Sequence, residues 1–295
     1  MHRAELVRAL GAWFAAHARD LPWRAPDTTA YGVLVSEVMS QQTPVARVAE
    51  PWRQWVARWP TPRALAEAPT AHVLRAWGTL GYPRRALRLQ EAARAIVDRH
   101  DGVVPRDIDE LTALPGVGAY TAAAVACFHY KQHIPAIDTN VRRVAHRYFS
   151  AQFLTPPPRV ADKTLVARFM PTREDPADVR ALAATVPLAL MELGALVCQA
   201  RAAHCDACPL APGCAWVAAG KPAPTAEQLR SKRVQKFTGT DRQCRGRIMA
   251  ALRAAPQGVT LAEVAWENEA QKQQCAESLV ADGLARAEGA RLLLP

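Results

Sequence analysis

Hydrophobic residues recur at every third or fourth position along most of the chain, which is the spacing of an amphipathic helix. In the first such segment, residues 3–18, one face carries Leu6, Leu10, Trp13 and Phe14. The same pattern predicts further helices over residues 31–42, 45–59, 71–77, 84–99, 108–114, 119–130 and 140–149. Alternation with a period of two, the mark of a half-buried strand, is scarce before the far C-terminus. The pattern therefore predicts an all-α fold.

Three tryptophans, Trp52, Trp55 and Trp59, follow helical spacing within residues 45–59. Such a stripe can act as a platform for stacked bases, but at this spacing it more often fills a core. We therefore expect these rings in the hydrophobic core.

The pattern changes beyond residue 216. Residues 217–240 contain a Pro-rich stretch (221–224) and a basic run (230–233), which are typical of a linker. In residues 241–295, Thr260 and Glu263 have the spacing of a capping box, followed by a predicted helix over 268–282 and a hairpin over 285–294. This order predicts a small winged-helix-like module. Its last helix is mainly acidic, so we expect it to pack rather than to read DNA.

Composition narrows the class of partner. The 295 residues carry a formal net charge of +10, with a pI of about 9.6. Nucleic acid is the first candidate partner for so basic a chain, and a basic surface kept for solubility is the alternative. No apolar run reaches the ~18 residues of a membrane span, and the first residues lack the apolar core of a signal peptide. We expect a cytoplasmic protein.

Four of the seven cysteines, Cys198, Cys205, Cys208 and Cys214, have the spacing C-x6-C-x2-C-x5-C. Four thiolates so close in sequence can hold one 4Fe–4S cluster. Zinc sites more often pair two C-x2-C knuckles, although His204 offers an alternative zinc ligand. The spacing favours the iron–sulfur cluster over zinc or free thiols. The other three cysteines are expected to be buried or incidental.

A short turn is predicted between two helices at residues 114–118, Leu-Pro-Gly-Val-Gly. Pro115 ends the first helix, and two glycines, Gly116 and Gly118, allow a tight turn. Backbone amides from Gly116 through Val117 and Gly118 to Tyr120 can then face one phosphate oxygen. This pattern is a helix-hairpin-helix signature, which holds DNA without reading its sequence. An ordinary helical turn is the alternative.

Two carboxylates stand in contrasting surroundings. Glu37 is flanked at helical spacing by Val33 and Leu34, and an acid on such an apolar face would have a raised pKa. Asp138 precedes a helix, whose N-terminus favours an ionised carboxylate. One neutral and one ionised carboxyl group are the pair needed to break a glycosidic bond. The alternatives are a solvated helix residue for Glu37 and a plain helix cap for Asp138.

From about Leu21 to Cys214, the chain resembles the adenine DNA glycosylases, the MutY branch of the helix-hairpin-helix superfamily that also contains endonuclease III. The resemblance rests on the segments at 21–24 (LPWR), 36–39 (SEVM), 41–43 (QQT), 80–82 (LGY), 114–121 (LPGVGAYT), 138–141 (DTNV) and 192–195 (ELGA), followed by the cysteines. It implies a two-lobed helix-hairpin-helix glycosylase that carries one 4Fe–4S cluster.

The resemblance also implies roles for single residues. Glu37 matches the acid that protonates adenine N7, and Asp138 matches the residue that stabilises the cation at the sugar C1′. The other matches are Tyr120 and Asn140 beside the reacting groups, Gln42 and Tyr82 as wedges in the base stack, and Trp23, Arg24 and Leu188 at the base pocket. Lyases of the superfamily have a lysine at the position of Tyr120. A phenol cannot form a Schiff base, so we expect a monofunctional enzyme that leaves an abasic site.

The chain departs from the family pattern in three respects. Residues 241–295 are too few for the Nudix-like domain that reads 8-oxoguanine in many members. Leu188 stands where many adenine-specific members have Gln or Glu and where thymine-mismatch glycosylases have Leu. Ser40 and Pro83 replace residues that usually lie beside the wedges.

These observations predict four parts: residues 29–137 as a helical bundle with the hairpin, residues 1–28 with 138–216 as the cluster domain, 217–240 as a linker and 241–295 as the C-terminal module. The expected substrate is duplex DNA with adenine opposite 8-oxoguanine or guanine, bound by a monomer associated with the nucleoid. Two alternatives remain: a thymine or uracil mismatch glycosylase, and a non-enzymatic iron–sulfur DNA-binding protein.

Overall fold

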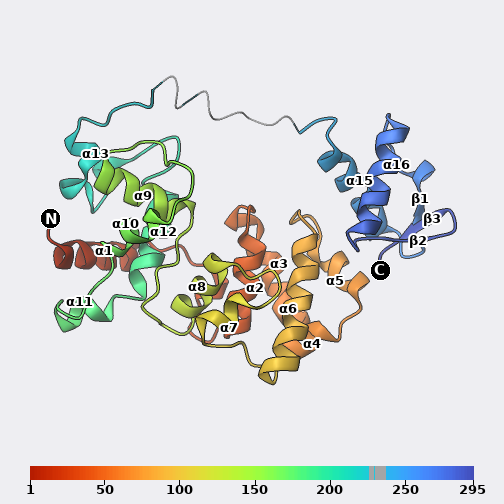
Figure 1. The fold of residues 1–295 in the computed structure, drawn as a ribbon, viewed down its shortest axis with the longest axis horizontal. Coiled ribbons are helices and arrows are strands. Elements are labelled where there is room, and N and C mark those ends of the chain that lie inside the picture. Colours follow the sequence, from red (N-terminus) through yellow and green to blue (C-terminus); the bar gives the residue numbers. More distant parts are fainter. Residues whose placement is uncertain (226–228, 230–236) are drawn as a thin grey trace. The chain divides into compact units, whose positions relative to one another are not determined.

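The computed structural model describes residues 1–225, 229 and 237–295, which group into two compact units (Figure 1). Unit 1 comprises residues 1–33, 106–112 and 118–233, and unit 2 comprises residues 34–105, 113–117 and 234–295. Helices dominate both units, which confirms the predicted all-α fold with a small strand-containing tail. The four-part division stays a prediction, and most of the basic part of the linker, including residues 230–233, lies outside the described residues. No helix in the described part of the chain is long and apolar enough to cross a membrane.

Unit 1 is built around α9 and α12. Its elements are α1 (Arg3–His17), the 3-10 turn Pro22–Arg24, α7 (Ile108–Thr112), α8 (Ala119–Phe128), α9 (Thr139–Ser150), α10 (Ala161–Ala167), α11 (Ala177–Ala181), α12 (Thr185–Leu196), the 3-10 turns Cys205–Ala207 and Ala211–Gly213, and α13 (Ala215–Ala218). Helices α1 and α9 both pack against α12. Asp138 caps α9 at its N-terminus, and Ala151 ends it in the left-handed conformation.

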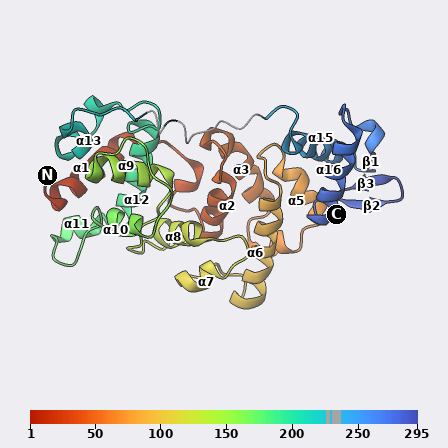
Figure 2. The same cartoon turned by 45° about the horizontal axis from the view of Figure 1, so that its top comes forward.

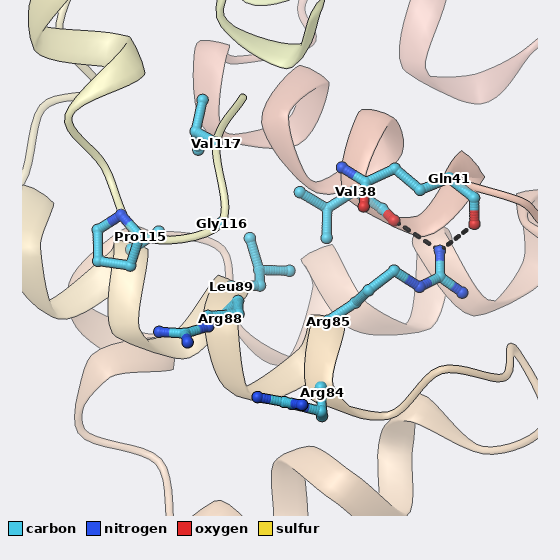
Figure 3. Close-up of a pocket in the computed structure, with 10 residues that line it drawn as sticks. Val38, Gln41, Arg84, Arg85, Arg88, Leu89, Pro115, Gly116 and Val117 are labelled. Carbon is cyan, nitrogen blue, oxygen red and sulfur yellow. Dashed lines mark hydrogen bonds between the residues drawn. The ribbon is translucent and has the colours of Figure 1, made fainter. Parts of the chain in front are cut away.

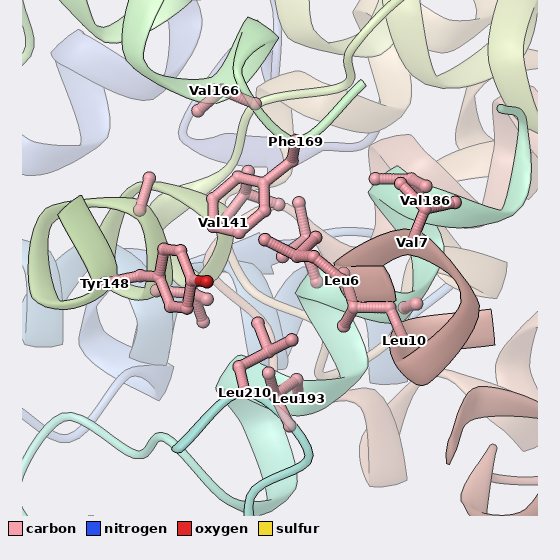
Figure 4. Packing of buried hydrophobic residues seen from close by; sticks show 14 of the residues in the cluster. Leu6, Val7, Leu10, Val141, Tyr148, Val166, Phe169, Val186, Leu193 and Leu210 are labelled. Atoms are coloured by element: carbon pink, nitrogen blue, oxygen red, sulfur yellow. The ribbon is translucent and has the colours of Figure 1, made fainter. Parts of the chain in front are cut away.

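Figure 4 shows the hydrophobic core of unit 1, where side chains of α1, α9 and α12 meet. Leu6 and Leu10, predicted for the apolar face of the first helix, are almost completely buried there. The ring of Phe169 packs on the rings of Tyr148 and Phe149. This core fixes α9 and α12 to each other, and with them the position of Asp138.

Unit 2 contains most of α2 and two helical groups. Its elements are α2 (Ala30–Ser40, beginning in unit 1), the 3-10 turn Val45–Arg47, α3 (Ala49–Arg58), α4 (Pro62–Ala66), α5 (Thr70–Trp77), α6 (Arg84–His100), α15 (Asp241–Ala254), β1 (Val259–Thr260), the 3-10 turn Leu261–Glu263, α16 (Glu269–Ala281), β2 (Arg286–Glu288) and β3 (Arg291–Leu293). Helices α4 and α5 pack against α6. Trp52, Trp55 and Trp59 are all buried, as expected of core residues, and Trp55 makes edge contacts with Trp59 and Trp77.

Residues 241–295, predicted as the C-terminal module, contain α15 and α16 beside three short strands (Figure 2). The strands pair antiparallel in the order β1-β3-β2, with Leu292 of β3 opposite both Val259 and Ala287. The capping box is present, since the Thr260 amide donates to Glu263 Oε2 at 2.7 Å. Helix, strand, turn, helix and hairpin follow one another as in a winged helix.

Candidate active site and DNA-binding elements

Glu37 lies in α2, a helix buried from residue 30 to residue 39. Glu37 is only 8% exposed, and Val33, Leu34 and Val38 around it are buried as well. The helix therefore keeps this residue away from bulk water.

Asp138 caps α9 and is held by two hydrogen bonds. Its Oδ1 accepts from the Val141 amide at 2.7 Å, and its Oδ2 accepts from Asn140 Nδ2 at 2.7 Å. Burial of the carboxyl group raises the pKa of Asp138, while these bonds and the nearby Arg143 act in the opposite direction. The helix N-terminus, which favours the ionised form, therefore does not set this pKa alone, because the cost of burial outweighs it.

A chain of hydrogen bonds connects Asp138 with the cysteine loop. Asn140 bonds to Asp138 and accepts from Arg143 Nη2 at 2.6 Å. The same guanidinium donates to the Gly194 carbonyl at 2.7 Å and, through Nε, to the Cys198 carbonyl at 2.7 Å. Gly194 must be small, because a Cβ there would lie 2.6 Å from Asn140 Cβ. The family-like segment 192–195 thus packs directly on the Asp138 site.

The four cysteines predicted as ligands line one small, apolar cavity of unit 1. Arg147 lies against it, 1% exposed, and donates to Cys198 Sγ at 3.2 Å and to the Gln199 carbonyl at 2.8 Å. Among the described residues, no three His, Cys, Asp or Glu side chains are arranged to hold a single metal ion. Four thiols around one cavity, with a guanidinium against them, fit the donor set of an iron–sulfur cluster.

Gly116 gives the hairpin its turn. It has φ +73°, and a Cβ at this position would lie 2.6 Å from Arg88 Cβ on α6. Gly118, by contrast, is extended at φ −89° and has open space around it. The Val117 amide donates to the Leu114 carbonyl at 3.1 Å, so it is used within the turn. The first intrahelical bond of α8 is donated by the Ala122 amide to the Gly118 carbonyl at 3.0 Å, so the helix begins directly after the turn.

Replacing Gly116 and Gly118 by alanine, one at a time, is expected to affect the stability of the protein to different extents. Gly116→Ala should lower the free energy of unfolding by about 2–3 kcal/mol, since it combines a left-handed backbone with a steric overlap. Gly118→Ala should stay within about 0.5 kcal/mol of wild type. Urea denaturation of both variants measures this difference, and equal stability of the two would contradict the assigned turn geometry.

Gln42 and Tyr82, the predicted wedges, both lie in exposed turns with left-handed backbone, at φ +53° and +46°. Such conformations are uncommon for residues other than glycine and persist where surrounding contacts hold them. Tyr82 is 38% exposed, which makes it one of the more accessible large side chains.

Arg85, which no sequence pattern indicated, ties these two turns together. Figure 3 shows its guanidinium bonded to the carbonyl oxygens of Val38 and Gln41, at 2.8 and 2.6 Å. It also donates to the Leu80 and Gly81 carbonyls at 3.1 and 3.0 Å. Burial lowers the pKa of Arg85 to about 10. Its remaining bonds reach Met39 O and Thr43 Oγ1.

A cavity of about 260 Å³ lies between the start of α6 and the hairpin (Figure 3). Three arginines line it, Arg84, Arg85 and Arg88, together with Gly116 and Val117. The hairpin is therefore flanked by positive charge, which suits an anionic backbone.

The predicted base-pocket residues belong to unit 1. Arg24 Nη2 binds Glu192 Oε2 at 2.9 Å, and Arg19 Nε binds the other carboxylate oxygen at 2.6 Å. Burial alone raises the pKa of Glu192, but the two arginines lower it to about 2. Arg24 is thus held by a buried carboxylate one helical turn after Leu188. Trp23, Leu188 and Tyr120 are half-buried.

Comparison with known proteins identifies the family of the chain. Residues 35–171 match the HhH-GPD superfamily of base excision DNA repair proteins. An adenine DNA glycosylase of Mycobacterium tuberculosis is 50% identical over 289 residues, 96% of this chain and 91% of that protein. The human adenine DNA glycosylase is 38% identical over 212 residues, 68% of this chain and 37% of that protein.

Two solved structures share the fold. A thermostable thymine-DNA glycosylase has a TM-score of 0.66 and 25% identity, covering 74% of this chain and 97% of its own. An endonuclease III–DNA complex has a TM-score of 0.60 and 22% identity, covering 75% of this chain and 98% of its own.

Fold and site together define a DNA glycosylase of the helix-hairpin-helix type, an enzyme of base excision repair. Within that class, the chain belongs to the adenine DNA glycosylase family. The resemblance seen in the sequence is confirmed.

Proposed function

We propose that this enzyme removes adenine opposite 8-oxoguanine or guanine in duplex DNA, with Glu37 as the acid and Asp138 as the anion. It acts as a monomer on nucleoid DNA. The observation that carries the proposal is the Asp138 carboxylate, fixed by Val141 and Asn140 in a chain half identical to curated adenine DNA glycosylases. A carboxylate so held supports a developing positive charge without having to reorganise.

The reaction follows from the two carboxyl groups. Inside the duplex the base cannot be enclosed by the active site or leave from C1′, so the nucleotide is first turned out of the base stack, with Gln42 and Tyr82 filling the step. Glu37 donates a proton to N7, and the glycosidic bond breaks as the base leaves with the bonding electrons. Asp138 stabilises the cation at C1′ until water adds there, and the proton that this water releases restores the acid form of Glu37. Tyr120 offers no amine for a Schiff base, so an abasic site remains.

We further propose that Cys198, Cys205, Cys208 and Cys214 hold one 4Fe–4S cluster. When bound, the cluster joins the ends of the cysteine loop through metal–thiolate bonds. The loop then holds the Cys198 carbonyl against Arg143, which bonds to Asn140. Iron and sulfide analysis of the purified protein should give about four of each per chain, whereas zinc or no metal would refute the cluster.

A panel of mispaired duplexes tests the substrate assignment. Single-turnover rates of base release should be highest for adenine opposite 8-oxoguanine, followed by adenine opposite guanine. Thymine opposite guanine is the rival substrate, favoured by Leu188 and by the likeness to a thymine-DNA glycosylase. Faster release of thymine than of adenine would overturn the proposal.

Asn140→Ala is expected to shift the pH dependence of base release. The variant keeps the Cβ that packs on Gly194 but removes a hydrogen bond that lowers the pKa of Asp138. The pKa of Asp138 should therefore rise further, and activity that needs the ionised carboxylate should be lost at a higher pH than in wild type. Single-turnover rates from pH 5 to 8 measure the acid limb. An unshifted limb would show that Asp138 is not the titrating group.

A further inference from the structure

The C-terminal module contacts the rest of unit 2 at the turn that carries Tyr82. The Arg242 guanidinium lies 4.6 Å from the centre of the Tyr82 ring. Beside it, Arg84 Nη1 lies 3.3 Å from Asp282 Oδ1, and Arg245 Nη2 binds Asp282 Oδ2 at 2.6 Å. The start of α15 is thereby held at one of the two turns assigned to base extraction.

The basic residues of the module are unevenly placed. Helix α15 carries four arginines and one aspartate, whereas α16 carries two glutamates and one lysine. Arg245 is directed to Ser278 and Asp282 of the α16 end, while Arg242 and Arg247 are exposed. The positive helix α15 therefore places Arg242 at Tyr82, while Asp282 at the end of α16 contacts the neighbouring Arg84.

The contact leaves Tyr82 accessible. The residue stays 38% exposed although the Arg242 and Arg85 guanidinium groups both lie over its ring, at 4.6 and 5.7 Å from the ring centre. A guanidinium group that stacks on an aromatic ring keeps its N–H groups at the edge of the plane, where they can bind phosphate. Arg85 directs its N–H groups to carbonyl oxygens, whereas Arg242 makes no such bond within the described part of the chain.

We propose that the C-terminal module is a second DNA-binding element and that Arg242 binds a backbone phosphate of the duplex where Tyr82 enters the base stack. The proposal rests on the role of Tyr82 in the proposed function. The Arg242 guanidinium lies over the ring of the wedge, and the Arg84–Asp282 ion pair connects the module with α6. The protein then grips the duplex both at the hairpin and beside the wedge.

The test compares Arg242→Ala with Arg247→Ala, a matched control at another exposed position of the same helix. Full-length proteins are titrated with a fluorescent duplex that contains adenine opposite 8-oxoguanine, at several salt concentrations between 50 and 200 mM. Because Arg242→Ala loses one phosphate contact, this variant should bind the duplex about tenfold more weakly than wild type. The slope of log Kd against log salt concentration should fall by about 1. Arg242→Lys should restore most of the slope, since it restores the charge.

Each other outcome overturns the proposal. Unchanged binding and slope for Arg242→Ala would make the contact purely structural, and tighter binding would mean that the module covers the DNA-binding face. An equal loss of duplex affinity in Arg247→Ala would mean that the effect comes from the overall positive charge of the helix and not from a phosphate contact of Arg242. Thermal unfolding of each variant checks that the module stays folded. Adenine release by the wild-type protein is measured separately, so a failed substrate assignment is distinguishable from a failed Arg242 contact.

Discussion

Replacing Glu37 by glutamine is expected to slow adenine release by about 10³-fold, the usual contribution of a positioned general acid. Glutamine has nearly the same shape and is uncharged, so it fits the buried position of Glu37 in α2 but cannot donate the proton. Binding of the mispaired duplex should be retained. Single-turnover kinetics and fluorescence anisotropy measure the two properties on the same preparation.

The matched control is Glu50→Gln on α3. Glu50 is exposed, with 68% of its side chain accessible, and it contacts Arg53 and Gln54 of its own helix. This variant should release adenine at the wild-type rate. A Glu37→Gln protein that keeps more than a tenth of the wild-type rate would remove Glu37 from the acid role.

Arg85→Met is expected to lower the free energy of unfolding by about 3 kcal/mol and to weaken duplex binding. The substitution preserves much of the aliphatic stem but leaves carbonyl oxygens of two turns without their charged donor. Unpaired buried acceptors cost about 1–3 kcal/mol each, and some of them will regain water. The turns of Gln42 and Tyr82 should then lose their fixed conformations. Urea denaturation and duplex titration measure both effects.

Arg88→Met, on the same helix α6, is the control for stability. The Arg88 side chain is exposed and its guanidinium bonds to Glu91 at the surface, so the change should stay within about 0.5 kcal/mol of wild type. Equal stability of the Arg85 and Arg88 variants would contradict the role of Arg85.

The helices with one polar and one apolar face were predictable, because exposure on one side imposes the period on the sequence. Helix α12 was not, since it is buried on most of its surface and its apolar residues show no clear period. Helices α10 and α11 were also missed, because elements of seven and five residues are too short to display one.

The candidate site was predictable where one segment carries the signal, as in the cysteine spacing or the cap formed by Asp138. Arg85 left no such signal, because its partners are backbone carbonyls that any residue provides. For Gly118 the sequence suggested a role that the structure does not require. Both glycines were expected to allow the tight turn, but the backbone of Gly118 is extended and only Gly116 has a left-handed conformation there. The place of α15 beside Tyr82 was not predictable either, because the contact joins residues far apart in the chain.

The path from Asp138 through Asn140 and Arg143 to the Cys198 carbonyl has a consequence for variants of the cysteine loop. A change that displaces this carbonyl disturbs the orientation of a carboxylate three hydrogen bonds away. Such a change far from the nucleotide would appear as a turnover defect: the enzyme would still bind duplex DNA but would release adenine slowly. The distance of a substituted residue from the bound base is therefore a poor guide to its effect on turnover.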